Sequence, residues 1–339
     1  MNDDFNPESL VEWPPAEAWV ERQDGVLRLR WTSHSPPAAV YAGPTPDVSG
    51  ADTMAVTIDA AARCATVAPA PSLPHPFFAL DFEDRRLVVA ERTVALPGGV
   101  NFRDLGGYRT AGGRAVRWGQ VYRAGSLAEL SDDDVAALGA LGLRLVCDLR
   151  SPDEVARRPD RLPPGAAYDH RPIVGEVGRL RRVVTLYRKR HRVQELLEEV
   201  YRVMLDQNSA TFAAVLRLAA DPANRPLVIH CTAGKDRTGL AAALLLLALG
   251  VPEETVVADY TLSNLAFEVL AGRMRPEMSR LYSFGFGEVQ LRPFLLAEAR
   301  TLRGALAYLR HRYGSLDWYF QRAGLDDVVV ERLRAELLE

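Results

Sequence analysis

Residues 228–240, VIHCTAGKDRTGL, combine a thiol, a lysine, an aspartate and an arginine within one short stretch. Cys231 and Arg237 stand six positions apart, between a short apolar run and a long one. A strand followed directly by a helix leaves unpaired N–H groups at the helix start, and the helix dipole adds positive potential there. The spacing therefore predicts an anion site with a cysteine at its mouth.

The side chains of this loop have the chemistry that phosphoryl transfer needs. A thiolate is stabilised at a helix N-terminus beside cations, so we expect Cys231 to be a nucleophile near neutral pH. The fork of Arg237 could hold two phosphate oxygens and stabilise charge in the transition state. Gly234 lets the backbone curl around the anion, and the hydroxyl of Thr238 could stabilise the sulfur as a leaving group. Together these residues predict thiol-dependent phosphoryl transfer to water.

An α/β arrangement is expected to position the loop. Ser131 and the three aspartates after it predict a helix start, and Gly142 predicts its end. Strands are expected within 120–127, 143–150, 166–172 and 226–230, and helices over 191–206, 209–220 and from the loop to Leu249. This alternation predicts a mostly parallel sheet flanked by helices. The helix after the loop is apolar on every face and should be buried, with the loop at the carboxyl end of a strand, where such sheets bind ligands.

The region before this arrangement has a different texture. From Val26 to about Glu91 the apolar residues alternate or come in short runs punctuated by proline and glycine. Short strands with frequent turns predict a small antiparallel β-sandwich. We therefore divide the chain into a β-rich, sandwich-like domain over 1–95 and an α/β domain over 96–339. The first is expected to serve the fold and to offer a docking surface for a protein partner.

Composition narrows the class of protein. The chain has 339 residues, 48% of them hydrophobic and 25% charged, with a net charge of −3, so we expect a soluble protein without a general attraction to nucleic acid or anionic membranes. Its longest apolar run, 240–251, is shorter than the ~20 residues that cross a bilayer, and the N-terminus does not resemble a secretory signal. Three scattered cysteines predict neither disulfides nor a zinc site, so we expect a reducing, cytoplasmic location and neither metal nor cofactor. Cys64 and Cys147 are assigned structural roles.

Several motifs resemble one enzyme family. The stretch HCTAGKDRTG (230–239) is similar to the signature of cysteine-dependent protein tyrosine phosphatases, and most like the atypical bacterial tyrosine/serine branch with its mycobacterial and listerial members. Four more stretches of the chain are similar to motifs of that branch and occur in the same order. They are NFRDLGGY (101–108), YRAGSL (122–127), DLRSPDEV (148–155) and YGSLDWYFQRAGL (313–325). The resemblance covers about 97–339. It implies a tyrosine-phosphatase-like fold with a helical lid, and hydrolysis of phosphate monoesters.

The resemblance also implies site roles. Cys231 would attack phosphorus to give a phosphocysteine, and Arg237 would bind the phosphate. The loop residues that would join it in the phosphate cradle are Thr232, Ala233, Gly234, Lys235 and Thr238. By contrast, the remaining motif charges are predicted to support the site residues or the fold, with some of them pairing with groups near the loop. They include Arg103, Asp104, Arg123, Asp148, Arg150 and Glu154.

The general acid does not follow from the family pattern. Relatives of this branch place an aspartate shortly after the strand equivalent to 166–172, but here that region reads RPIVGEVGRL and offers only Glu176. Asp236 lies inside the loop, within reach of a leaving oxygen. We therefore assign the acid to Asp236 first and to Glu176 second.

The substrate stays open between phosphotyrosine or phosphoserine proteins and phosphoinositides. Lys235 adds a second cation to the loop, a feature that resembles phosphatases of multiply phosphorylated substrates. Residues 179–192 carry seven arginines and lysines and no acid. They could form a basic lid that draws in anionic substrates, or a solvated helix face.

Two other functions use the same kind of loop. A phosphate-recognition module would bind phosphorylated partners without turnover, although the complete pair of Cys231 and Arg237 argues against it. An arsenate-reducing or sulfur-transfer enzyme would need extra redox cysteines, and the sequence does not suggest any. Hydrolysis of para-nitrophenyl phosphate in the presence of a chelator separates a phosphatase from the recognition module, whereas the third enzyme class would depend on arsenate or thiosulfate.

Overall fold

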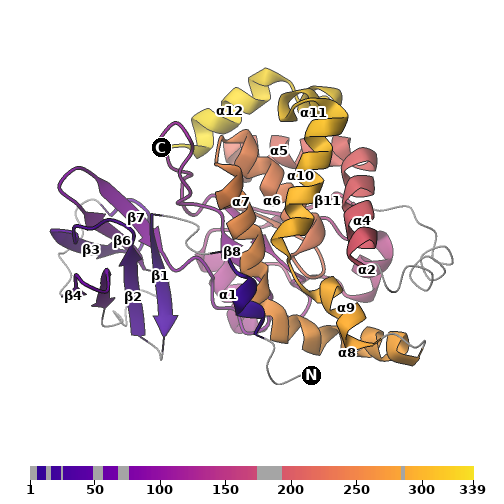
Figure 1. Ribbon diagram of the computed structural model, residues 1–339, viewed down its shortest axis with the longest axis horizontal. Helices are drawn as coiled ribbons and strands as arrows, with labels where there is room; N and C mark the ends of the chain where they lie inside the picture. The colour runs from indigo at the N-terminus through magenta and orange to yellow at the C-terminus, as the bar shows by residue number, and fades with distance from the viewer. Residues whose placement is uncertain are drawn as a thin grey trace.

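The computed structural model divides into a strand-rich N-terminal unit and a helix-rich C-terminal unit (Figure 1). It describes residues 6–12, 17–23, 26–48, 56–67, 76–173, 193–283 and 287–339. Glu176 and the basic segment 179–192, with the helical lid that was predicted there, lie outside the described residues.

The N-terminal unit consists of two antiparallel sheets. One has the order β1 (Ala18–Gln23), β2 (Val26–Trp31), β5 (Cys64–Val67), β4 (Val56–Asp59), and the other the order β3 (Ala39–Gly43), β6 (Phe77–Asp81), β7 (Arg86–Ala90). Alternate residues of β2 are buried, namely Leu27, Leu29 and Trp31. They form one apolar cluster with residues of the second sheet such as Phe78 and Leu80. Strands β2, β3, β5, β6 and β7 lie where the alternating pattern predicts them, whereas β1 and β4 were not predicted.

A five-stranded sheet is the centre of the C-terminal unit. Its order is β11 (Ala167–His170), β10 (Leu145–Asp148), β12 (Leu227–His230), β9 (Val121–Ala124), β8 (Arg103–Asp104). The first four strands are parallel to one another, and the short β8 at the edge is antiparallel to β9. The predicted mixed α/β fold with a mostly parallel sheet is therefore present.

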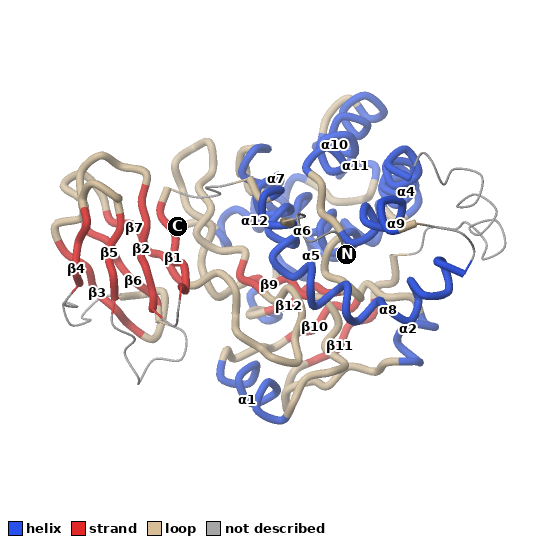
Figure 2. Tube along the Cα trace, turned by 60° about the horizontal axis from the view of Figure 1, so that its bottom comes forward, coloured by secondary structure: helices blue, strands red, loops and turns tan. Residues whose placement is uncertain are grey.

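Helices cover both faces of this sheet (Figure 2). Because side chains alternate along a strand, Val146 and Val228 pack on one face with α1 (Asp132–Ala140), while Cys147 and Ile229 pack on the other. The remaining helices are α2 (Pro152–Arg157), α4 (Val193–Gln207), α5 (Ser209–Ala220), α6 (Asp236–Ala248), α7 (Glu253–Thr261), α8 (Phe267–Ser283), α9 (Glu288–Leu295), α10 (Ala299–Tyr313), α11 (Leu316–Arg322) and α12 (Asp327–Leu337). Short 3-10 turns are η1 (Pro7–Leu10), η2 (Pro222–Asn224) and η3 (Leu262–Ala266).

Local sequence signals explain where these helices begin and end. Ser131 and Asp134 form a reciprocal capping box at the start of α1, as the sequence predicts, and Gly142 follows its end with φ of 69°. Helix α6 is buried along most of its length, since it lies under the sheet among other helices. No helix in the described part of the chain is both long and apolar enough to cross a membrane.

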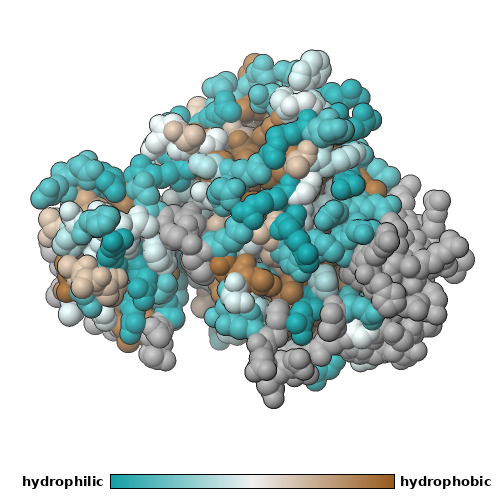
Figure 3. Space-filling model, in the orientation of Figure 1, coloured by the Kyte–Doolittle hydropathy of each residue, from teal (hydrophilic) through white to brown (hydrophobic). Residues whose placement is uncertain are grey.

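Contacts of two kinds join the units. Trp118 of the C-terminal unit is buried in an apolar cluster with Phe77 and Ala90, and its indole N–H donates to the Val88 carbonyl at 3.0 Å. The segment 6–12, which precedes the first strand, lies instead against the C-terminal unit, where Glu12 pairs with Arg303 at 2.8 Å (Figure 1). On the face drawn in Figure 3 both units are mainly hydrophilic, with apolar patches between the helices.

Candidate active site

The loop Cys231–Lys235 joins the carboxyl end of β12 directly to the N-terminus of α6. Lys235 stands at the N-cap of this helix, and its side chain makes no capping bond to the first N–H groups. Gly234 has φ of 68°, and a Cβ there would stand 2.5 Å from the Ala124 carbonyl carbon and the Gly125 nitrogen of the β9 end. Only glycine permits both this conformation and this approach.

Cys231 lies at the base of the loop and is only 2% exposed. Thr238, one turn into α6, is fully buried, and among the described residues its hydroxyl has no hydrogen-bond partner. Cys147 lies on the neighbouring β10, where burial raises the pKa of its thiol far above the usual range. Cys64 belongs to β5 of the N-terminal unit. The structure therefore places Cys231, and neither of the other two cysteines, at the N-terminal end of α6.

Glu154 on α2 fixes the guanidinium of Arg237. The two terminal nitrogens of Arg237 donate to the two carboxylate oxygens at 2.7 and 2.9 Å, and the Thr232 hydroxyl donates to the same carboxylate at 2.5 Å. Burial alone would raise the pKa of Glu154, but Arg237 and Thr232 hold it well below its usual range. Glu154 is thus an ionised acceptor, and neither of the two bonds to it uses Nε of Arg237.

Asp236, the first residue of α6, has two donors on one oxygen. Its Oδ1 accepts from the Tyr201 hydroxyl at 2.7 Å and from the Lys235 ammonium at 2.8 Å, so neither donor occupies Oδ2. Burial and then the Asp236 charge raise the pKa of Tyr201 well above its usual range, so this phenol is neutral. A second buried phenol, Tyr260, lies 2.7 Å from the Tyr201 oxygen. The Asp236 side chain remains 33% exposed, which leaves it open to a substrate.

The sequence predicts that Lys235 adds a second cation to the phosphate cradle, but its ammonium group pairs with Asp236. Its side chain is 2% exposed, and the ammonium donates to Asp236 and, at 3.1 Å, to the carbonyl of Leu296. The positive charge therefore lies beside Asp236 within the interior.

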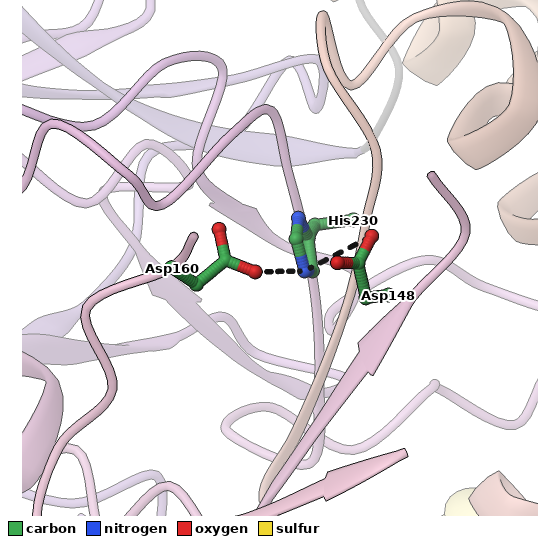
Figure 4. A group of neighbouring side chains, drawn as sticks. All are labelled: Asp148, Asp160 and His230. Carbon is green, nitrogen blue, oxygen red and sulfur yellow. Dashed lines mark ion pairs between the residues drawn. The ribbon is translucent and has the colours of Figure 1, made fainter. Parts of the chain in front are cut away.

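His230 precedes the cysteine and lies between two carboxylates (Figure 4). Its Nε2 is 3.2 Å from Asp160 and 3.7 Å from Asp148. These three side chains are close enough together to hold a metal ion. However, the Arg150 guanidinium already bridges the two carboxylates, at 2.7 Å from Asp148 and 2.5 Å from Asp160. A cation from the chain itself thus offsets one of the two carboxylate charges, and the cluster braces the end of β10 against that of β12.

The structure brings most of the predicted site residues together at one end of α6. Cys231, Thr232, Ala233, Gly234, Lys235, Asp236, Arg237 and Thr238 all belong to the loop or to the first turn of the helix. The sequence placed Glu154 among the charges that support the site residues or the fold, and the structure shows it in direct contact with Arg237. Tyr201 was missed because its position on α4 fits an ordinary apolar stripe, and no local signal marks its partner 35 residues away.

Comparison with known proteins supports the same interpretation. A family model described as "Tyrosine phosphatase family" matches residues 94–339. A tyrosine-protein phosphatase of Cupriavidus necator is 35% identical over 248 residues, which cover 70% of this chain and 85% of that protein. The triple specificity protein phosphatase PtpB of Mycobacterium tuberculosis is 32% identical over 279 residues, covering 72% of this chain and 98% of that protein.

A more distant likeness exists to a crystal structure of P. aeruginosa TpbA. It has a TM-score of 0.28 and 15% identity, over 62% of this chain and 90% of that chain. The family model, which matches residues 94–339, spans the C-terminal unit with its Cys231 loop. The chain belongs to the tyrosine phosphatase family.

Proposed function

We propose that the chain hydrolyses phosphate monoesters through a phosphocysteine formed on Cys231. The observation that carries this proposal is the uncapped start of α6 around Cys231, with Arg237 held over the same loop by Glu154. Free N–H groups, a helix dipole and a fixed guanidinium together form a site for a dianionic phosphate.

In the first step the Cys231 thiolate attacks phosphorus. A P–S bond forms while the P–O bond to the leaving group breaks, and charge on the equatorial oxygens is stabilised by Arg237 and the loop amides. We assign the proton that the leaving oxygen takes to the carboxyl group of Asp236, which is partly exposed and held in place by Tyr201. Glu154 is unsuited to this role because its depressed pKa keeps it ionised.

In the second step water attacks the phosphocysteine. The P–S bond breaks, the thiolate leaves, and the Asp236 carboxylate takes the proton that the water loses. The buried hydroxyl of Thr238, which no described residue engages, is available to donate to the departing sulfur. Inorganic phosphate then leaves, and the enzyme returns to its starting state.

For substrates we propose proteins that carry phosphotyrosine or phosphoserine, with phosphoinositides as a further class. Membership of the tyrosine phosphatase family supports the first class, and the name of PtpB records that this relative has three specificities. The buried ammonium of Lys235 gives the second class less support than the sequence suggested, because that charge already has Asp236 as its partner. Comparing kcat/KM for a panel of phosphopeptides and short-chain phosphoinositides tests which class is preferred. A higher kcat/KM for the phosphoinositides would reverse the proposed order.

We also propose that residues 1–95 form a sandwich-like, non-catalytic domain that docks a protein partner, and that 96–339 form the catalytic domain. In support, strands β1 to β7 end by Ala90, and the family match begins at residue 94. A proteolytic fragment that begins near residue 95 should keep its kcat/KM for para-nitrophenyl phosphate and lose kcat/KM for a phosphoprotein. Equal retention on both substrates would remove the docking role.

The direct test of the reaction uses para-nitrophenyl phosphate in the presence of EDTA. The wild-type enzyme should turn over, and Cys231→Ser should lower kcat by at least about 10³-fold, because a hydroxyl at this position is a far weaker nucleophile. Cys64→Ser, a cysteine on β5, is the matched control and should retain wild-type activity. Binding of phosphate without any turnover by the wild-type chain would favour a recognition module instead.

The role of Asp236 has its own test. Asp236→Asn keeps the shape of the side chain but removes the acid, so turnover of an alkyl phosphate should fall about 10²-fold or more, the usual contribution of a general acid. An activated aryl phosphate needs little protonation and should lose much less. An equal loss on both substrates would contradict the assignment.

A further inference from the structure

Successive carbonyl groups of the Cys231 loop point away from the anion site and are held by hydrogen bonds from outside the loop. The Thr232 carbonyl accepts from the Ser126 N–H at 3.0 Å. The Asn101 side-chain amide donates to the carbonyls of Ala233 and Gly234, at 3.4 and 3.0 Å. In a trans peptide the carbonyl and the next N–H point in opposite directions. Turning these carbonyls outward therefore turns the following N–H groups toward the phosphate position.

Arg123 adds a second bond to the same Gly234 carbonyl, at 2.8 Å. This arginine is fully buried on β9, and its other terminal nitrogen donates to Asp259 of α7 at 2.6 Å. Arg103 of β8 donates to the same carboxylate at 3.1 Å and also to the side-chain oxygen of Asn101. The loop is thus backed by the partly buried Asn101 and by three buried charged side chains, Arg103, Arg123 and Asp259. These four residues come from three elements and one loop.

The charges of this set matter as much as its hydrogen bonds. Burial and the neighbouring Arg123 lower the pKa of Arg103 to about 10, so Arg103 still carries its charge at neutral pH. Burial alone would raise the pKa of Asp259, but the two arginines hold it well below its usual range. Two guanidinium groups against one carboxylate leave a net positive charge behind the loop, where water cannot screen it. That charge favours an anion on the other side of the loop.

We propose that Asn101, backed by Arg103, Arg123 and Asp259, is a positioning residue that holds the loop amides toward the phosphate. This goes beyond the structural role expected of these motif residues, because it predicts a defect in binding the anion. It rests on the proposed function of the Cys231 loop.

Two substitutions of Asn101 test this positioning role. Its φ of 54° is left-handed, so alanine there would add backbone strain, whereas glycine removes the amide without that strain. Asn101→Gly tests the loss of the two donated bonds. Asn101→Asp keeps the size and the acceptor for Arg103, but it places an oxygen against the carbonyls of Ala233 and Gly234 in place of a donor. The aspartate variant should therefore be the weaker binder of the two.

The readout is inhibition by tungstate, an oxyanion that binds without reacting, measured with para-nitrophenyl phosphate well below the melting temperature of each variant. We expect the Ki of tungstate to rise about five- to tenfold in Asn101→Gly, as for a lost hydrogen bond to an ordered group, and further in Asn101→Asp. The matched control is Asn208→Gly, which removes an amide that donates to the Met204 carbonyl at 3.1 Å. It should lower the melting temperature and leave the Ki unchanged.

The outcomes separate this inference from the proposed function. Wild-type Ki values in both Asn101 variants, with Cys231→Ser inactive, would overturn the positioning role alone. Full activity of Cys231→Ser would overturn the phosphocysteine mechanism, whatever Asn101 does. A Ki that rises equally in Asn208→Gly would also overturn the inference, because the effect would then follow general stability.

Discussion

Arg237 illustrates what a single residue needs in order to bind phosphate well. An arginine side chain has many rotamers, and ordering it on each binding event costs free energy. Glu154 has already ordered it through two hydrogen bonds at 2.7 and 2.9 Å, neither of which uses Nε. The Glu154 carboxylate, which the sequence placed among supporting or structural charges, is therefore expected to contribute to phosphate affinity.

Replacing Glu154 measures this contribution. Glu154→Gln loses the charge and one of the two acceptors, so kcat/KM for para-nitrophenyl phosphate should fall about 10- to 100-fold, as for a lost hydrogen bond between charged groups. Most of the change should be in KM, since phosphate binding is what is weakened. Glu331→Gln, on an exposed turn of α12, is the control. A loss of less than twofold in Glu154→Gln would contradict the role.

At the scale of elements, the strand, loop and helix around Cys231 could be predicted from the sequence almost completely. Three local signals predict them: the short strand 227–230, Gly234 in the loop, and the long apolar helix that follows. The parallel arrangement of the sheet was predicted because strands alternate with helices along the chain. The partners of the loop could not be predicted in the same way. Asn101, Glu154 and Tyr201 reach it across 133, 83 and 35 positions of sequence, so only tertiary packing brings them there.

Gly234 is the point at which these elements constrain the loop most. Gly234→Ala would place a Cβ 2.5 Å from the backbone of β9, so the loop must move and its amides must lose their alignment. We expect kcat/KM to fall by more than about 10²-fold, the scale of a misplaced oxyanion site. Gly113→Ala is the control, because Gly113 also has a positive φ, of 84°, but open space around it. It should lose stability and retain activity; equal activity in the two variants would refute the steric account.

For the whole molecule, buried charge links stability to pH. Burial alone would raise the pKa of Asp148, but its hydrogen bonds with Arg150 outweigh this and lower the pKa to about 2. The value in the unfolded chain is about 3.9. The stabilisation is therefore fully present above about pH 4 and is lost as the pH falls toward 2; its size is about 2–3 kcal/mol.

Asp148→Asn should remove this pH-dependent stabilisation. At pH 7 the free energy of unfolding in urea should drop by at least about 2 kcal/mol, since Arg150 also loses one of its two buried carboxylate partners and retains only Asp160. The difference from the wild-type enzyme should shrink between pH 4 and pH 2, where the native carboxylate is itself protonated. A difference that stays constant over that range would show that the Asp148 charge is not its source.

Trp118 connects the N-terminal unit to the stability of the whole molecule. Its side chain is 4% exposed and packs against strands of that unit. No local pattern in the sequence marks this contact, because the tryptophan lies in a loop of the other unit. Trp118→Ala should cost about 3–5 kcal/mol in unfolding free energy, the usual cost of emptying a large buried site. Urea unfolding measures it, and a cost below 1 kcal/mol would mean that the junction is not a packed core.

The most direct test of the central claim is to trap the covalent intermediate. Enzyme mixed with ³²P-labelled substrate and quenched in acid within one turnover should carry label that maps to Cys231 by peptide mass spectrometry. The label should be absent from Cys231→Ser and should accumulate when its hydrolysis is slowed. Turnover without any labelled cysteine, or label on another residue, would contradict phosphoryl transfer through Cys231.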